Sequence, residues 1–199
     1  MTIEAEATVI TMPVSRDTEG DPEEARWLVR ARLGDEAAFT WLLNRYRNRV
    51  IRLAAHILRR PDEAEDAAQE AFIRAFRNIR AFRGDSRFTT WLFHIVLRVC
   101  LDRRRLKRWD SEVQWDDTLP LSSPKDPIDT RLVVNALLKE LSPPLRAALV
   151  LRELEGMEYE DIAHVLGIPV GTVRSRLNAA RARFRDLYMR VVEETNRVQ

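Results

Sequence analysis

The sequence predicts an all-α protein of two small helical domains joined by a flexible linker, and three observations support this. Nearly every patterned segment repeats its apolar residues with the helical period, whereas no alternating run is long enough to predict a strand. Residues 110–127 interrupt this pattern with acid, serine and proline. The chain has 199 residues, of which 45% are hydrophobic, so each half is long enough to bury a core.

The first half predicts four helices behind a tail. Residues 1–23 lack a helical pattern, and we expect them to be disordered. We expect helices over Glu23–Leu33, Glu36–Arg59, Asp62–Phe82 and Thr89–Arg108. Asp35 is suited to cap the second helix, and Asp62, with Glu65 three residues later, the third. These residues form the expected first domain, 24–108, which the linker 109–127 follows.

The second half predicts a helical domain over residues 128–192, followed by a short tail, 193–199. Helices over Ile128–Leu141 and Pro143–Glu153 precede a helix-turn-helix, Tyr159–Arg185. Gly167 lies where the turn needs a residue that can take positive φ.

The second helix of this motif has two distinct faces. Its apolar face holds Val173, Leu177, Ala180 and Phe184. A polar stripe beside it holds Arg174, Asn178, Arg181 and Arg185, one side chain per turn. Arginine pairs with guanine edges and phosphates, and the major groove is wide enough for one helix. The stripe therefore predicts DNA binding.

Composition limits the remaining classes of function. The net charge is only +2, yet basic residues concentrate in 98–108 and 174–185, which indicates two nucleic-acid surfaces. Cys100 is the single cysteine and the three histidines have no ligand spacing, so we expect no disulfide, metal or cofactor. No segment approaches about 20 apolar residues and the N-terminus carries acid, so we expect a soluble, cytoplasmic protein without membrane insertion.

Four motifs resemble those of a known family. The segments DAAQEAFIRAFRNIRAFRGDS, TTWL, SPPLRAALVLRELEGMEYEDIA and GTVRSR follow the order and spacing found in the extracytoplasmic-function group (group 4) of bacterial sigma-70 factors. The resemblance covers about residues 24–192 and implies a region 2-like and a region 4-like domain. It implies a factor that directs promoter recognition and melting in a stress or envelope response, without enzymatic activity.

The resemblance also implies partners and site residues. Core RNA polymerase would bind the first domain through the clamp of its largest subunit, and the second through its beta flap. An anti-sigma factor is a further expected partner. The residues expected to contact the clamp are Asp66, Gln69, Glu70 and Phe72.

Promoter DNA would contact both domains. The residues expected at the −10 element are Arg83, Asp85, Ser86, Phe88, Thr90, Trp91, Arg98, Arg103 and Arg104. An extruded base needs aromatic walls and polar groups that read its edge, although Trp91 is equally suited to the core. Arg98 stands where the family commonly has asparagine, which brings the −10 preference into question. The residues expected at the −35 element are Thr172, Arg174, Ser175, Asn178, Arg181 and Arg185.

Two alternatives belong to other classes. A helix-turn-helix regulator that works without polymerase would normally carry a receiver of alternating strands and helices, and residues 24–108 show no such alternation. An enzyme would need convergent catalytic groups. Asp66 and Glu70 have the spacing of a carboxylate pair on a helix, but no histidine lies near them in the sequence.

Overall fold

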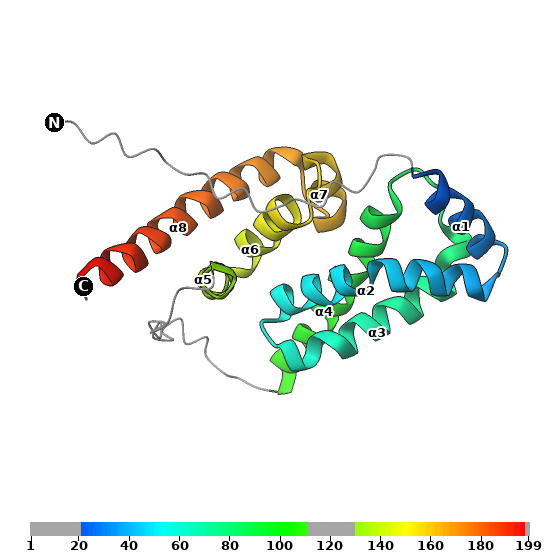
Figure 1. Cartoon of the computed structure of the whole chain (residues 1–199), viewed down its shortest axis with the longest axis horizontal. Coiled ribbons are helices and arrows are strands. Elements are labelled where there is room, and N and C mark those ends of the chain that lie inside the picture. Colours follow the sequence, from blue (N-terminus) through cyan, green and yellow to red (C-terminus); the bar gives the residue numbers. More distant parts are fainter. Residues whose placement is uncertain (1–20, 111–129, 198–199) are drawn as a thin grey trace.

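The computed structural model describes residues 21–110 and 130–197, and every regular element in these ranges is helical, as predicted. The first domain contains α1 (Pro22–Arg32), α2 (Glu36–Leu58), α3 (Pro61–Asn78), the 3₁₀ turn η1 (Ile79–Ala81) and α4 (Phe88–Asp110). The second contains α5 (Thr130–Lys139), α6 (Pro143–Leu149), the π-helical turn η2 (Val150–Leu154), α7 (Tyr159–Leu166) and α8 (Val170–Arg197). Figure 1 shows the two groups of helices side by side.

The start of α2 confirms one predicted cap, and the start of α3 corrects another. The Asp35 carboxylate accepts a hydrogen bond from the Ala38 backbone N–H at 3.1 Å, as expected for an N-cap. The prediction that Asp62 caps the third helix is wrong, because the helix begins one residue earlier, at Pro61. Proline suits the first helical position, where its fixed φ and missing N–H cost nothing. Asp62 therefore lies in the first turn and pairs with Arg60 at 3.2 Å.

Other boundaries differ from the prediction by a few residues. The third helix ends at Asn78 and tightens into η1, whereas the prediction continued it to Phe82. The predicted helix Pro143–Glu153 divides into α6 and η2. The last helix continues to Arg197, beyond the predicted end of the domain at residue 192. The linker predicted at 109–127 begins inside α4; the rest of it and most of the predicted N-terminal tail lie outside the described residues.

An aromatic cluster fixes the start of α4 on the first domain. The Phe88 ring is almost fully buried, and its centroid lies 5.4 Å from that of Tyr46 and 5.7 Å from that of Phe82. Trp91 is half-buried and packs on both Phe82 (5.3 Å) and Phe88 (5.7 Å). Burial of several aromatic rings is a large contribution to stability, so this cluster holds the preceding loop at a defined place.

The helix-turn-helix has the core that its sequence predicts. Val173, Leu177 and Ala180 are completely buried, and Phe184 packs against the same core from a half-buried position. Gly167 ends α7 with φ = +64°, the conformation for which glycine was expected. The opposite side of α8 is left facing solvent.

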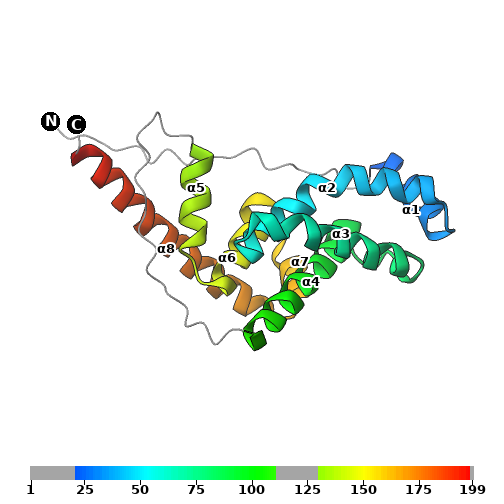
Figure 2. The same ribbon diagram turned by 90° about the horizontal axis from the view of Figure 1, so that it is seen from below.

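The two domains contact each other through α2 and α4 of the first and α6 and α7 of the second. In both views α4 lies beside α7, and the contacts include α2 against α6 (Figure 2). None of the helices in residues 21–110 and 130–197 is long and apolar enough to cross a membrane.

Candidate nucleic-acid interface

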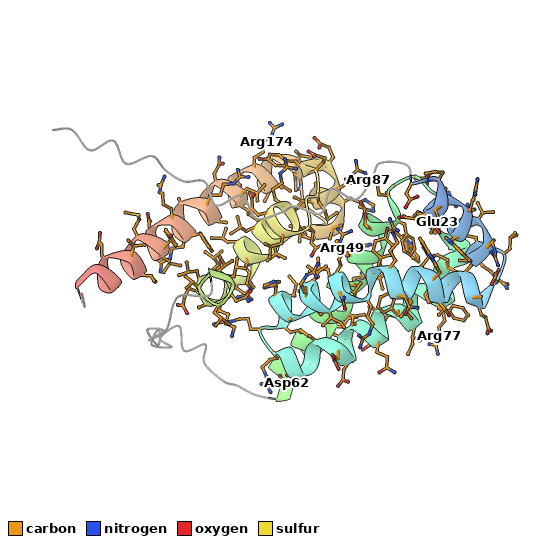
Figure 3. The ribbon with its side chains drawn as sticks, viewed as in Figure 1. Glu23, Arg49, Asp62, Arg77, Arg87 and Arg174 are labelled. Atoms are coloured by element: carbon orange, nitrogen blue, oxygen red, sulfur yellow. The ribbon has the colours of Figure 1, made fainter. Side chains whose placement is uncertain are left out.

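The polar stripe of α8 is exposed along its whole length. Arg174, Asn178, Arg181 and Arg185 are all exposed, because the neighbouring face of the helix is buried in the core. Figure 3 shows Arg174 extending away from the ribbon. A row of exposed arginines on one helix has the dimensions needed to enter a major groove.

Thr172 and Ser175 lie at the N-terminal end of this stripe. The Thr172 side chain is half-buried and that of Ser175 is exposed. The Ser175 hydroxyl donates to the Thr172 carbonyl oxygen at 3.0 Å. Both residues lie in the first two turns of α8, where helix N–H groups favour a phosphate.

Two arginines of the stripe differ in their surroundings. The Arg181 guanidinium donates from Nη2 to Glu153 Oε1 at 2.6 Å and from Nε to the same oxygen at 3.0 Å. Hydrogen bonding to Glu153 raises the pKa of Arg181 further above its usual range. Arg174, in contrast, has no ion pair with another described residue. Arg181 must therefore leave a carboxylate before it can contact DNA, whereas Arg174 need not.

The second group of predicted DNA contacts lies on the loop before α4 and on the start of that helix. Arg83 and Asp85 are exposed, and Ser86 is half-buried. Thr90 is only 1% exposed, because α7 of the second domain covers it. Its hydroxyl donates to Asp161 Oδ1 on α7 at 3.1 Å. In this conformation the loop is accessible while Thr90 is not.

The basic end of α4 lies against α3. Arg98 is exposed, in keeping with a polar role. Arg103 donates to Glu70 Oε2 from Nη2 at 3.0 Å and to the Asp66 carbonyl oxygen at 3.1 Å. The structure thus brings a residue expected at the −10 element into contact with two expected at the polymerase. Arg104 also belongs to α4, but its side chain lies outside the described ones.

The residues predicted to meet the polymerase do not share one environment. Asp66 and Gln69 are exposed on α3, whereas Phe72 is buried. Glu70 is half-buried between two arginines, because Arg74 donates to its Oε1 at 2.6 Å from one side and Arg103 bonds its Oε2 from the other. Its carboxylate is therefore already neutralised within the domain.

A groove lies between α2 and α3 and was not predicted from the sequence. It has a volume of about 660 Å³ and is lined by apolar side chains from both helices and rimmed by charged and polar ones. Ile73 and Phe76 lie in it with 45% and 43% of their surface exposed. The Phe76 ring makes an edge contact with Phe39 across the groove, at 5.0 Å between centroids.

The sequence does contain a signal for this groove. Asp66, Gln69, Ile73 and Phe76 follow one another at spacings of three, four and three residues, so they form one stripe along α3. Two exposed apolar residues that continue an acidic and amide stripe indicate a binding surface. Among the described residues, no group of three or more side chains is arranged to hold a metal ion.

Comparison with known families and proteins gives consistent matches. Sigma-70 region 2 matches residues 42–110 and Sigma-70, region 4 matches residues 131–184. The chain is 37% identical over 174 residues to the RNA polymerase sigma-H factor of Pseudomonas aeruginosa, covering 80% of this chain and 90% of that protein. It is 35% identical over 172 residues to the ECF RNA polymerase sigma-E factor of Escherichia coli K12, covering 76% of this chain and 87% of that protein.

Two solved structures share the fold. CnrH in complex with the cytosolic domain of CnrY is 25% identical with a TM-score of 0.63, covering 83% of this chain and 96% of that one. The sigma factor RpoE of Bartonella quintana, in complex with the anti-sigma factor NepR, is 25% identical with a TM-score of 0.65, covering 76% of this chain and 96% of that one.

Proposed function

The chain belongs to the extracytoplasmic-function group of the sigma-70 family and is an RNA polymerase sigma factor, and on that premise we propose how its two domains divide the work. The family is non-enzymatic, so RNA synthesis belongs to the core polymerase. This chain supplies promoter recognition and melting.

The first domain docks on the clamp of the largest polymerase subunit through α3. The stripe of Asp66, Gln69, Ile73 and Phe76, together with the groove beside it, offers acid for steering and apolar surface for affinity. Exposed apolar side chains rimmed by polar ones are the usual composition of a docking surface. Carboxylates facing a basic partner accelerate association and fix register more than they add affinity.

The loop before α4 and the exposed side of α4 contact the −10 element. Arg83, Asp85 and Ser86 offer donors and acceptors for a base edge. The half-buried Trp91, which packs on the buried Phe88, offers aromatic surface beside them. Thr90 is buried under the second domain and cannot contact DNA in this conformation. The two domains therefore separate before Thr90 contacts the −10 element.

The second domain reads the −35 element with α8. The exposed stripe from Arg174 to Arg185 enters the major groove, and Thr172 at the helix start contacts phosphate. The beta flap of the polymerase holds the same domain on its other side. Since Arg98 replaces the usual asparagine on α4, the −10 sequence preferred by this factor differs from that of its relatives.

We place the protein in the cytoplasm, where its polymerase lies, and assign it an anti-sigma factor as regulator. Support for a regulator comes from the fold shared with RpoE, which was solved with the anti-sigma factor NepR. Support for a role in a stress or envelope response comes from similarity to sigma-E factors.

The observation that carries this division is that one chain presents both an exposed arginine stripe on α8 and an acid-rimmed apolar groove on α3. Transcription with purified core polymerase on fragmented DNA of the source genome tests it. We expect discrete transcripts that share two upstream elements. DNA binding without any such transcripts, with a core shown to be active by a control factor, would favour a regulator that works without polymerase.

A charge reversal on α3 tests docking on the polymerase separately. Asp66→Lys reverses an exposed charge beside the groove, and we expect it to abolish assembly with core polymerase. Glu70→Lys is less informative, because it would place a third cation between Arg74 and Arg103 and disturb the fold. Glu193→Lys, on an exposed side chain near the end of α8, is the matched control. Equal assembly of both variants would disprove docking through α3.

A further inference from the structure

All three histidines of the chain lie where the two domains meet. We call this contact the interdomain interface: α2 and α4 on one side, and α6, η2 and α7 on the other. His94 of α4 and His164 of α7 face each other with ring centroids 5.7 Å apart. His56 of α2 faces the buried Arg146 of α6, whose charge acts on the imidazole.

An ion pair lies in the same interface, between α2 and the end of η2. Arg49 Nε donates to Glu155 Oε2 at 2.8 Å, and the two side chains are 11% and 2% exposed. The Arg49 guanidinium also lies over the Phe93 ring at 5.2 Å. Figure 3 shows Arg49 between α2 and the helices of the second domain. Removing one partner of such a pair leaves the other charge buried and unpaired, so a substitution of Arg49 should strongly disfavour the closed form.

The interface covers part of the proposed −10 site. Thr90 is 1% exposed and bonded to Asp161, so α7 must leave α4 before the Thr90 hydroxyl can reach a base. The closed conformation is therefore incompatible with the full proposed DNA contact.

We propose that the interdomain interface is a latch that holds the free protein closed over Thr90, and that protonation of His56 and His94 opens the latch. Its consequence for transcription rests on the proposed role of Thr90, whereas the opening itself does not.

The charges around the histidines are mainly positive. His94 meets Arg98 on its own helix and His164 from α7, the helix that also carries the Asp161 carboxylate bonded by Thr90. His56 meets Arg146 from α6 and Arg52 on its own helix. A proton on His56 or His94 is therefore added close to an arginine.

The pKa values point in the same direction. Burial first, and then the nearby cations, lower the pKa of His56 to about 4. Burial, Arg98 and His164 lower the pKa of His94. A histidine with a lowered pKa in the closed form takes up its proton on opening, so the closed form loses stability as the pH falls below about 6.5.

Glu155 acts in the opposite direction. Burial raises its pKa above the ordinary 4.5, while Arg49 opposes that shift. The closed form therefore holds a proton on Glu155 more readily than the open form does, which favours closure in acid. The histidine effect is best measured at pH 6.0, above the ordinary pKa of a glutamate.

The size of the effect follows from the two pKa values of His56. With about 6.5 in the open form and about 4 in the closed form, lowering the pH from 7.5 to 6.0 raises the ratio of open to closed protein about fourfold. The lowered pKa of His94 raises this ratio further in the same direction.

Single-molecule energy transfer in the full chain tests the proposal. One dye is attached to Arg77→Cys on α3 and the other to Met189→Cys on α8, since both positions are exposed while Cys100 is completely buried. We expect the low-transfer population to grow from pH 7.5 to pH 6.0, and the variant carrying His56→Gln and His94→Gln to lack this growth. A wild type insensitive to pH, or an unchanged response in that variant, would overturn the proposal.

A second pair of variants keeps the latch testable if the glutamine variant does not fold, which far-ultraviolet circular dichroism will reveal. Arg49→Ala should give mostly low transfer even at pH 7.5. Arg45→Ala, one turn earlier on α2, breaks an ion pair with Asp21 inside the first domain and should stay closed. Equal transfer in both would overturn the latch. Opening that leaves transcription unchanged would retain the latch and refute the role of Thr90.

Discussion

Ile73 and Leu101 allow a matched test of the groove between α2 and α3. Both are aliphatic side chains on helices of the first domain, with 45% and 43% of their surface exposed. Ile73 lines the groove, and Leu101 on α4 does not. Because both are buried to the same extent, replacement by alanine should cost each a similar part of the free energy of unfolding.

The expected loss of binding follows from the exposed area of Ile73. Complete burial of an isoleucine or leucine side chain contributes about 1.5–3 kcal/mol. If the polymerase covers the 45% that folding leaves exposed, Ile73 contributes about 0.7–1.4 kcal/mol to docking. Ile73→Ala should therefore weaken the affinity for core polymerase about three- to tenfold, while Leu101→Ala leaves it unchanged.

The assay is a titration of fluorescently labelled protein with core polymerase, read as anisotropy at fixed ionic strength. Urea unfolding of both variants checks that their free energies of unfolding fall equally. An equal loss of affinity in both variants, or none in Ile73→Ala, would refute the assignment of the groove to polymerase docking.

The remaining predictions concern the second domain and one cap. Leu177→Ala should lower the free energy of unfolding by about 2–5 kcal/mol in urea, because this completely buried side chain leaves a cavity. Arg174→Ala should cost about 1–3 kcal/mol in holoenzyme affinity for the −35 element but little on scrambled DNA, if the guanidinium contacts guanine. Arg181→Ala should cost less, because its pair with Glu153 must first be broken, and Glu153→Gln should strengthen binding; retention of labelled promoter DNA on filters measures all three variants. Asp35→Ala should lower the melting temperature at pH 7, and the difference should shrink below pH 3.8, because the cap and Arg30 lower the pKa of Asp35 and its stabilisation is lost on protonation.

The recognition helix was predictable in detail because its determinants are local. A period of 3.6 residues separates Val173 and Leu177 from Arg174 and Asn178 whatever surrounds them, and the structure buries the first pair and exposes the second. Asp35 and Gly167 act on neighbouring backbone groups, so their roles as cap and turn residue were predictable as well. Pro61 is also a local signal, because proline favours the first position of a helix. The prediction of a cap at Asp62 did not use that preference.

Packing between distant segments decided the rest. Arg103 and Glu70, which are hydrogen-bonded, lie 33 positions apart in the sequence. The separation is 106 positions for the pair of Arg49 and Glu155, and 71 positions for the hydrogen bond from Thr90 to Asp161. Helical period identifies which residues share a face of one helix, but not which helix that face meets. The sequence by itself therefore determined the helices, the family and the exposed arginine stripe. Only the tertiary structure decided that the charge of Glu70 is neutralised by arginines of its own domain and that Thr90 is buried under α7. Charge neutralisation and burial depend on which helices come together in space.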